Sequence, residues 1–168
     1  MKNRSINMLI VALLIFALFS AAIIFFIADT HEKFPNRIMV RANGITESII
    51  DVDGLYLRPA GTSEYDINLV CAATGVYYVY LDYEEKVDGG MKQFVHVVIE
   101  SDGEPVYEGS LAELLAEGED EKIVEYISDL DDDEPNVITI KYSMSDSIGN
   151  EAQGTYSSFR IHLRIVKK

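Results

Sequence analysis

Three acidic side chains of this chain alternate in a spacing that suits calcium. Asp129, Asp131 and Asp133 are placed like the first three ligands of an EF-hand loop, and carboxylate oxygens suit Ca²⁺. The match stops there, because Glu134 stands where such a loop needs glycine and Ile140 stands where it needs glutamate. The pattern leaves two interpretations, a solvated acidic loop or a calcium site.

Other chemistry has less support. His31-Glu32 begins like the HExxH helix of zinc proteases, but Pro35 stands where the second histidine belongs. His96 and His162 have no ligand neighbour at metal spacing, so we expect one partly buried and one surface histidine. The sequence contains no nucleophile elbow, phosphate-binding glycine loop or cysteine–histidine pair. We therefore expect a protein without catalytic residues, and without a metal or cofactor apart from the calcium alternative.

A cluster of tyrosines leaves another choice open. Tyr77, Tyr78, Tyr80 and Tyr83 crowd one expected strand, where they either pack in the core or form a platform for sugars or another subunit. The single cysteine, Cys71, cannot form an internal disulfide, and we expect it to be a small buried hydrophobic residue.

Charge narrows the class of partner. The 168 residues carry 28 acidic and 14 basic side chains, for a net charge of −14. Only two of the bases and none of the acids precede Asp29, so the remaining chain has 28 acids against 12 bases, net −16. Such a surface lacks the basic footprint that nucleic acid requires. With 48% hydrophobic residues, the chain can still bury a core.

Period-two patterns predict strands after the first 40 residues. Alternating runs occur at 64–72, 136–144 and 156–166, and runs rich in β-branched and aromatic residues at 76–83 and 94–100 are expected to be covered on both faces. Asp102-Gly103 is placed for a two-residue hairpin, and strands near 37–52 are less sharply defined. No strand–helix–strand rhythm is present, which favours an all-β antiparallel β-sandwich.

One helical insertion is predicted at about 110–130. Ser110 and Glu113 form a capping box, and Leu111, Leu114 and Leu115 form an apolar stripe. Gly118 is placed to end this helix, and 121–130 is expected to form a second one with Ile123, Ile127 and Leu130 on one side.

The amino terminus predicts export. Met8–Ala28 is an uncharged run of 21 residues, which as a helix spans about 30 Å, one hydrocarbon core. Bases precede it and acids follow it, so the rest of the chain is expected outside the cell. Either the run is a transmembrane anchor, or it is a signal peptide cleaved after Ala22. The expected organisation is a signal or transmembrane segment at 1–28, a stalk or donor strand at 29–40, and a β-sandwich at 41–168.

The region before the last expected strand contains the motif GNEAQG, with Gly149, Asn150, Glu151, Gln153 and Gly154. This motif resembles the carboxy-terminal signature of the TasA/camelysin group of exported Gram-positive surface proteins. Leu57-Arg58-Pro59-Ala60-Gly61 is similar to the family's L-x-P-G turn, and 98–115 to its hairpin with a following helix. Phe25-Phe26 and Asp29 are similar to the start of the mature family chain.

The resemblance implies a jelly-roll-like sandwich that polymerises into biofilm-matrix fibres, in which each subunit's amino-terminal strand completes a neighbour's sheet. It implies homo-oligomers or related surface subunits as partners, and the cell membrane or the secreted matrix as the location. The competing interpretation is a membrane-anchored monomeric domain that binds a ligand or partner outside the cell. The family's metallopeptidase label finds no zinc motif here. From its residues, the GNEAQG loop is expected to brace the last strand, with an ion site as the alternative.

Overall fold

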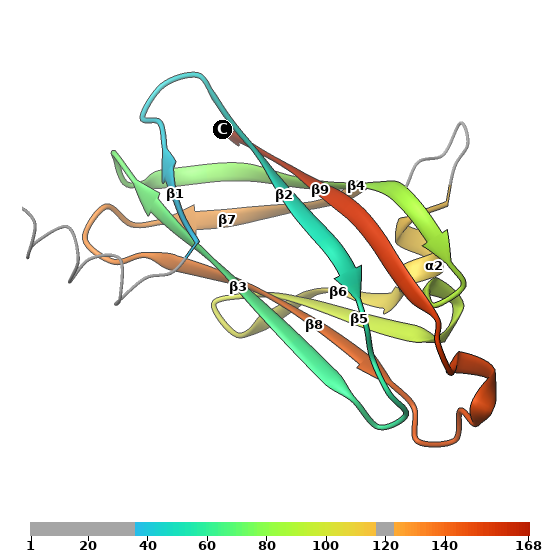
Figure 1. Cartoon of the computed structure of the whole chain (residues 1–168). Helices are drawn as coiled ribbons and strands as arrows, with labels where there is room; N and C mark the ends of the chain where they lie inside the picture. The colour runs from blue at the N-terminus through green and yellow to red at the C-terminus, as the bar shows by residue number, and fades with distance from the viewer. Residues whose placement is uncertain (1–35, 117–122) are drawn as a thin grey trace, which may run out of the picture. The chain divides into compact units, whose positions relative to one another are not determined.

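Two β-sheets make up most of the folded chain (Figure 1). The computed structural model describes residues 36–116 and 123–168, and all that follows concerns those residues. A five-stranded sheet has the order β1-β3-β8-β5-β6, and a four-stranded sheet has the order β2-β9-β4-β7. The strands are β1 (Arg37–Val40), β2 (Ile45–Leu55), β3 (Thr62–Cys71), β4 (Gly75–Gly89), β5 (Val95–Ser101), β6 (Glu104–Ser110), β7 (Ile123–Leu130), β8 (Asn136–Met144) and β9 (Tyr156–Lys167). Short helical segments are η1 (Lys92–Phe94), α2 (Leu111–Leu114) and η2 (Asn150–Ala152).

The chain changes sheet at almost every connection. Successive strands lie in opposite sheets, except for the β5–β6 hairpin within the five-stranded sheet. Neighbouring strands are antiparallel, except that β1 runs parallel to β3. One open side of the sandwich brings β1 against β2, and the other brings β6 against β7. The expected all-β architecture of two largely antiparallel sheets is confirmed.

The core lies between the sheets and takes alternate residues from each strand. The inward faces of β8 and β9 are those that the alternation predicts, and no side chain on them is more than 3% exposed. They are Ile138, Ile140, Tyr142, Met144, Phe159, Ile161, Leu163 and Ile165. Cys71 is buried beside Ile67 and Leu69 on β3, as expected.

The hairpin between β5 and β6 forms at Asp102-Gly103. Both residues have positive φ, 49° and 83°, as a two-residue turn of this kind requires. The Asp102 carboxylate also accepts the Val137 N–H at 2.8 Å, which fixes the turn against the start of β8.

The expectation that 76–83 and 94–100 are covered on both faces is wrong. Only one face of each strand is buried, with Tyr77, Val79 and Leu81 on β4 and Val95, Val97 and Ile99 on β5. No further layer lies outside either sheet in the part of the chain that the structure describes. The β-branched and aromatic residues on the outer faces therefore reflect strand preference instead of two-sided burial.

The helical insertion at 110–130 is confirmed in its first part only. Ser110 Oγ accepts the Glu113 N–H at 3.2 Å and Glu113 Oε2 accepts the Ser110 N–H at 3.0 Å, which completes the capping box. The helix α2 ends at Leu114, and Gly118, the expected helix end, lies outside the described residues.

The predicted second helix at 121–130 is wrong, because Ile123–Leu130 is strand β7 and pairs antiparallel with β4. Its inward residues are Val124, Tyr126, Ser128 and Leu130, at strand spacing. Ile123 and Ile127, expected on one side of that helix together with Leu130, are exposed, whereas Leu130 is buried.

The folded unit begins earlier than the sequence suggested. It runs from Asn36 to Lys168, so β1 belongs to the sheet and lies before the expected boundary at residue 41. Met8–Ala28 and Ala22 lie outside the described residues. Among the residues that are described, no helix is long and apolar enough to cross a membrane.

Candidate functional site

The edge of β3 in the five-stranded sheet is only partly covered. Strand β1 pairs with β3 from Arg37 opposite Asn68 to Val40 opposite Cys71. The preceding stretch of β3, from Thr62 to Ile67, has β8 on one side and no described strand on the other. More than half of this ten-residue strand is therefore a free edge.

Backbone groups point out of this free edge. The N–H groups of Asn68 and Ala72 donate toward β1, to the carbonyls of Asn36 at 3.2 Å and Val40 at 3.0 Å. Because backbone direction alternates along a strand, the N–H and C=O groups of Glu64 and Asp66 face the same edge. The Asp66 carbonyl accepts the Asn36 side-chain amide at 3.1 Å. No hydrogen bond involves the Glu64 N–H within the described residues.

Apolar side chains lie behind the free edge. Tyr65 of β3 and Ile50 and Val52 of β2 face inward, but they are only partly buried while packing against the core. These residues belong to the two edge strands on the β1–β2 side of the sandwich. The free edge thus combines unpaired backbone groups with apolar surface, which is the combination that an added strand would satisfy.

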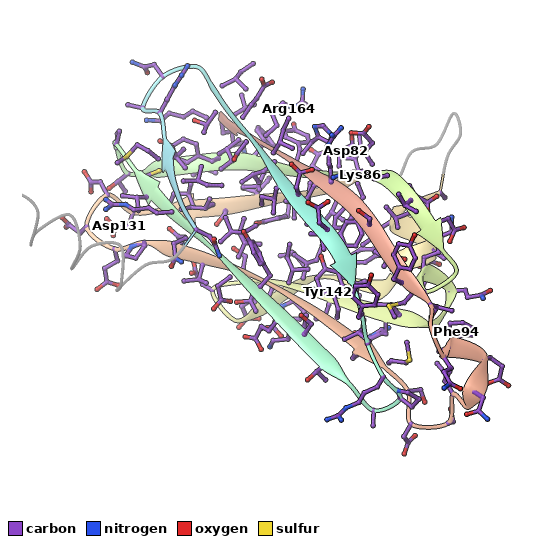
Figure 2. The ribbon with its side chains drawn as sticks, in the orientation of Figure 1. Asp82, Lys86, Phe94, Asp131, Tyr142 and Arg164 are labelled. Carbon is purple, nitrogen blue, oxygen red and sulfur yellow. The ribbon has the colours of Figure 1, made fainter. Side chains whose placement is uncertain are left out.

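An ion-pair network crosses the outer face of the four-stranded sheet; one of its members, Lys86, is labelled in Figure 2. Arg160 Nε lies 3.0 Å from Asp51 Oδ1, Lys86 Nζ lies 3.1 Å from that same oxygen, and His162 Nε2 lies 2.8 Å from Glu84 Oε2. The hydrogen bonds from Lys86 and, to a smaller extent, from Arg160 lower the pKa of Asp51. The largest cause of the lowered pKa of Glu84 is its hydrogen bond with His162. These groups are solvent-exposed, so the network orders the face while adding little stability.

Two of the four clustered tyrosines pack in the core, and the other two face outward. Tyr77 and Tyr83 are buried in the core, whereas Tyr78 and Tyr80 lie on the outer face of the sheet. The Arg164 guanidinium stands 4.5 Å from the centre of the Tyr80 ring, and Lys168 Nζ stands 5.8 Å from that of Tyr78. Each of the two outward rings therefore makes a cation–π contact with a basic side chain of this chain.

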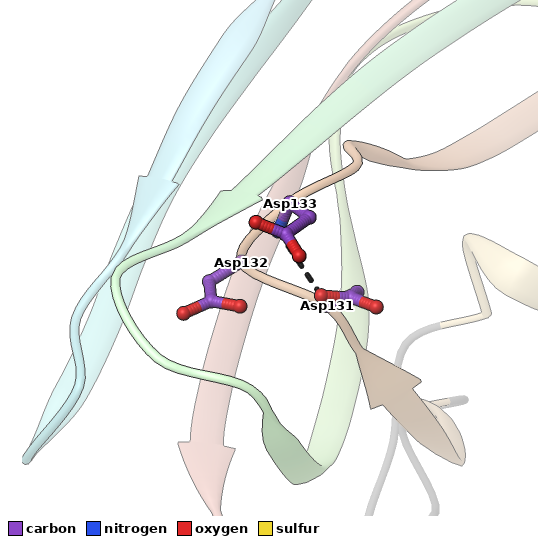
Figure 3. Close-up of side chains that lie close together, drawn as sticks. All are labelled: Asp131, Asp132 and Asp133. Atoms are coloured by element: carbon purple, nitrogen blue, oxygen red, sulfur yellow. Dashed lines mark hydrogen bonds between the residues drawn. The ribbon is translucent and has the colours of Figure 1, made fainter.

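The predicted calcium ligands are not brought together as a set. Asp131, Asp132 and Asp133 place carboxylate oxygens within 4.8 Å of one another, and Asp129, in β7, is not part of that group (Figure 3). Asp131 Oδ1 accepts the Asp133 N–H at 3.0 Å, and this hydrogen bond is the largest cause of the lowered pKa of Asp131. Asp132 Oδ1 accepts the Thr74 hydroxyl at 2.6 Å. These contacts give the exposed acidic loop a structural role, tying the β7–β8 turn to the β3–β4 turn.

The GNEAQG motif forms a closed loop before β9. Asn150–Ala152 is the short helix η2, Ala152 is buried, and Gly154 has a φ of 78° that favours glycine. Glu151 Oε2 accepts the Gly149 N–H at 2.9 Å, and the Ala152 carbonyl accepts the Thr155 hydroxyl at 2.8 Å. No hydrogen bond from the Asn150 or Gln153 side chain occurs in the described part of the chain.

Replacing Glu151 with alanine is expected to lower stability by about 1 kcal/mol, because the Gly149 N–H loses its charged acceptor. Thermal melts with calcium and with chelator should show the same loss, and Glu151→Gln, which keeps an oxygen acceptor, should recover part of it. A loss that occurs only when calcium is present would contradict this loop-bracing role and indicate an ion site.

The histidines are not brought together. His96 is exposed and lies 3.3 Å from Glu108 Oε1 across the β5–β6 hairpin, not partly buried as expected. His162 is on the polar face of β9, as expected, and His31 lies outside the described residues. The free edge of β3 had no signal in the sequence beyond the alternation of β3, because the strand beside it, β1, has only four described residues.

Comparisons with known proteins add little. No model of a known protein family matches the chain, and no curated protein matches it. Among solved structures, a β-glucosidase from Paenibacillus barengoltzii is similar at a TM-score of 0.37 and 9% identity over 78% of this chain. The chain spans 11% of the length of that enzyme. Similarity at this level carries no argument about activity.

Proposed function

We propose that this chain is a non-enzymatic exported surface protein that assembles by accepting a β-strand from another copy at the free edge of β3. The observation that carries the proposal is that the backbone N–H and C=O groups of Glu64 face out of an edge backed by partly buried apolar side chains. An added strand would pair those groups and cover Tyr65, Ile50 and Val52.

The TasA/camelysin resemblance supports the same proposal. Its implied jelly-roll topology agrees with the strand order, in which β2-β9-β4-β7 faces β3-β8-β5-β6 and β1 is added beside β3. The donor in this proposal is the apolar segment Ile23–Ile27 of a second copy, freed by cleavage after Ala22. The protein is then a fibre subunit of the cell-surface matrix, whereas an uncleaved chain is a membrane-tethered fibre anchor.

Electron microscopy of purified chains tests the proposal. A chain beginning at Ile23 is expected to form filaments, and a chain beginning at Asn36, which keeps β1 but lacks the donor, is expected to stay monomeric. The proposal fails if the longer chain assembles at no calcium concentration.

A proline at position 64 tests the edge itself. Glu64→Pro removes an N–H that faces the free edge and leaves the β3–β8 ladder intact, so filaments should be lost while the melting curve changes little. The matched control, Glu64→Thr, removes the charge but keeps the N–H and should still assemble. Filaments formed equally well by the proline variant would show that strands are not added at this edge.

One feature favours a second function, a monomeric extracellular domain that binds a partner. The outer face of the four-stranded sheet bears a groove of about 1110 Å³, lined by residues that include Tyr80, Asp82, His162 and Arg164. If both the Ile23 and the Asn36 chains remain monomeric, this function replaces fibre assembly.

A further inference from the structure

Isoleucine side chains gather on the outer face of the four-stranded sheet. Ile45 and Ile49 on β2 and Ile123 and Ile127 on β7 project there, and between 46% and 59% of each is exposed. Among the described residues, strands of the five-stranded sheet contribute only Met39 to the large exposed hydrophobic side chains. Exposed apolar groups concentrated on one face of a protein indicate an interaction site.

The strand register arranges this face in three rows. Across the sheet, one row is Ile49, His162, Asp82 and Ile123, the next is Glu47, Arg164, Tyr80 and Glu125, and the third is Ile45, Val166, Tyr78 and Ile127. The isoleucines therefore stand at the corners of a patch about 13 Å along the strands and about 14 Å across them. A patch of this size accommodates one α-helix, which is about 10–12 Å wide with its side chains.

The charges on this face are divided between its edges and its centre. The outward ionisable residues of the two edge strands are all acidic: Glu47, Asp51 and Asp53 on β2, and Glu125 and Asp129 on β7. In the centre, Arg160 and Lys86 are already ion-paired. Arg164 stacks on Tyr80.

Glu47 and Glu125 have no ion pair in the described part of the chain. Arg164 and Lys168, which lie over Tyr80 and Tyr78, also have no ion pair among the described residues, so the centre of the face keeps some positive charge. The two edges of the face are acidic, and they flank the isoleucines on both sides.

Two symmetric arrangements of a second copy on the same face bring like charges together. With a two-fold axis along the strands, Glu47 of one copy would lie over Glu125 of the other; with the axis across the strands, each glutamate would lie over its own equivalent. Both arrangements place like charges opposite each other, which opposes association. The face is complementary to an aliphatic surface bordered by bases.

We propose that the outer face of the four-stranded sheet binds a basic amphipathic helix of another protein. The aliphatic side chains of that helix pack on the four isoleucines, and its lysines or arginines lie beside Glu47 and Glu125. This face is separate from the β3 edge, so the binding does not depend on strand addition.

Fluorescence anisotropy tests the binding directly. The full chain, held in nanodiscs of neutral phosphatidylcholine, is titrated against a labelled helical peptide of leucine and lysine about 18 residues long, with empty discs subtracted. Saturable binding is expected at micromolar concentration. The paired change Ile49→Thr with Ile127→Thr should raise Kd about tenfold or more. The paired change Glu47→Lys with Glu125→Lys should do the same.

A matched pair on the other sheet controls for the acidity of the chain. Glu104→Lys with Glu108→Lys places the same charge change on exposed positions of β6 and should alter Kd less than about threefold. Melting curves verify that each variant folds. If the isoleucine variant does not fold, the glutamate variant still tests the proposal.

Three outcomes overturn the proposal. The first is the absence of saturable binding up to about 100 µM peptide. The second is an equal loss in the β6 control, which indicates general attraction to an acidic protein. The third is sedimentation that shows a dimer of the unmodified chain separating when Ile49 and Ile127 are changed, which assigns the face to a second copy.

Discussion

Replacing Phe159 with alanine is expected to destabilise the folded unit by about 3–5 kcal/mol, a large part of the stability of an ordinary domain. Phe159 is fully buried on β9, and its ring centre lies 5.8 Å from that of Tyr83 and 5.9 Å from that of Tyr142. These tyrosines come from β4 and β8, so a single side chain joins the two sheets. Urea denaturation of the purified chain measures the loss.

Two companion variants separate the cavity from other effects. Phe159→Leu keeps an apolar group in the same space and is expected to cost roughly half as much. Ile49→Ala, on the outer face, should change stability by less than about 0.5 kcal/mol. If Phe159→Ala cost no more than the Ile49 change, the two sheets would not be joined through this residue.

Strands buried on one face were the easiest elements to predict. For β8 and β9 the alternation gave the inward residues correctly, and the expected bounds at 136–144 match those found. The reason is physical, because one buried face imposes a period of two on the sequence wherever the other face meets water. The capping box at Ser110 was equally visible, since both of its hydrogen bonds are local.

Strand β7 was missed because its sequence fits two periods. Ile123, Ile127 and Leu130 follow a helical spacing, while Val124, Tyr126 and Leu130 follow the strand spacing that the structure adopts. Pairing with β4 decides between them, and that pairing joins strands that lie far apart in the sequence. The proposed binding face was not predictable for the same reason, because Ile123 and Ile127 were expected on one side of a helix and not on the outer face of a strand.

The β3 edge was not predictable for a related reason. The alternation of β3 shows which side chains face inward, but which strands lie beside β3 is a property of the topology. Within residues 36–116 and 123–168, the edge is open because β1 has four residues against ten in β3. The candidate calcium residues depend in the same way on where β7 ends, because Asp129 lies in the strand whereas Asp131 and Asp133 lie in the turn that follows it.

Alkaline solution is expected to unfold the protein steeply above about pH 10, the ordinary pKa of tyrosine. Burial raises the pKa of Tyr77 to about 12 and raises those of Tyr83, Tyr126 and Tyr142 as well. A raised folded-state pKa gives stability that is complete below the unfolded value and is lost as pH rises through the folded value. The Tyr77 hydroxyl, which donates to the Ala73 carbonyl at 2.7 Å, is one of the groups whose ionisation contributes to this loss.

Denaturation midpoints between pH 7 and 12 check this expectation, with Tyr83→Phe as the decisive variant. The Tyr83 hydroxyl is buried without a hydrogen-bond partner in the described residues, so its removal should leave stability at pH 7 nearly unchanged or slightly raised. Above pH 10 the variant should resist unfolding better than the unmodified chain, since one buried group no longer ionises. The control Tyr56→Phe changes a side chain that is 69% exposed and should leave the alkaline transition where it is. Identical alkaline transitions in all three chains would mean that ionisation of buried tyrosine does not drive the unfolding.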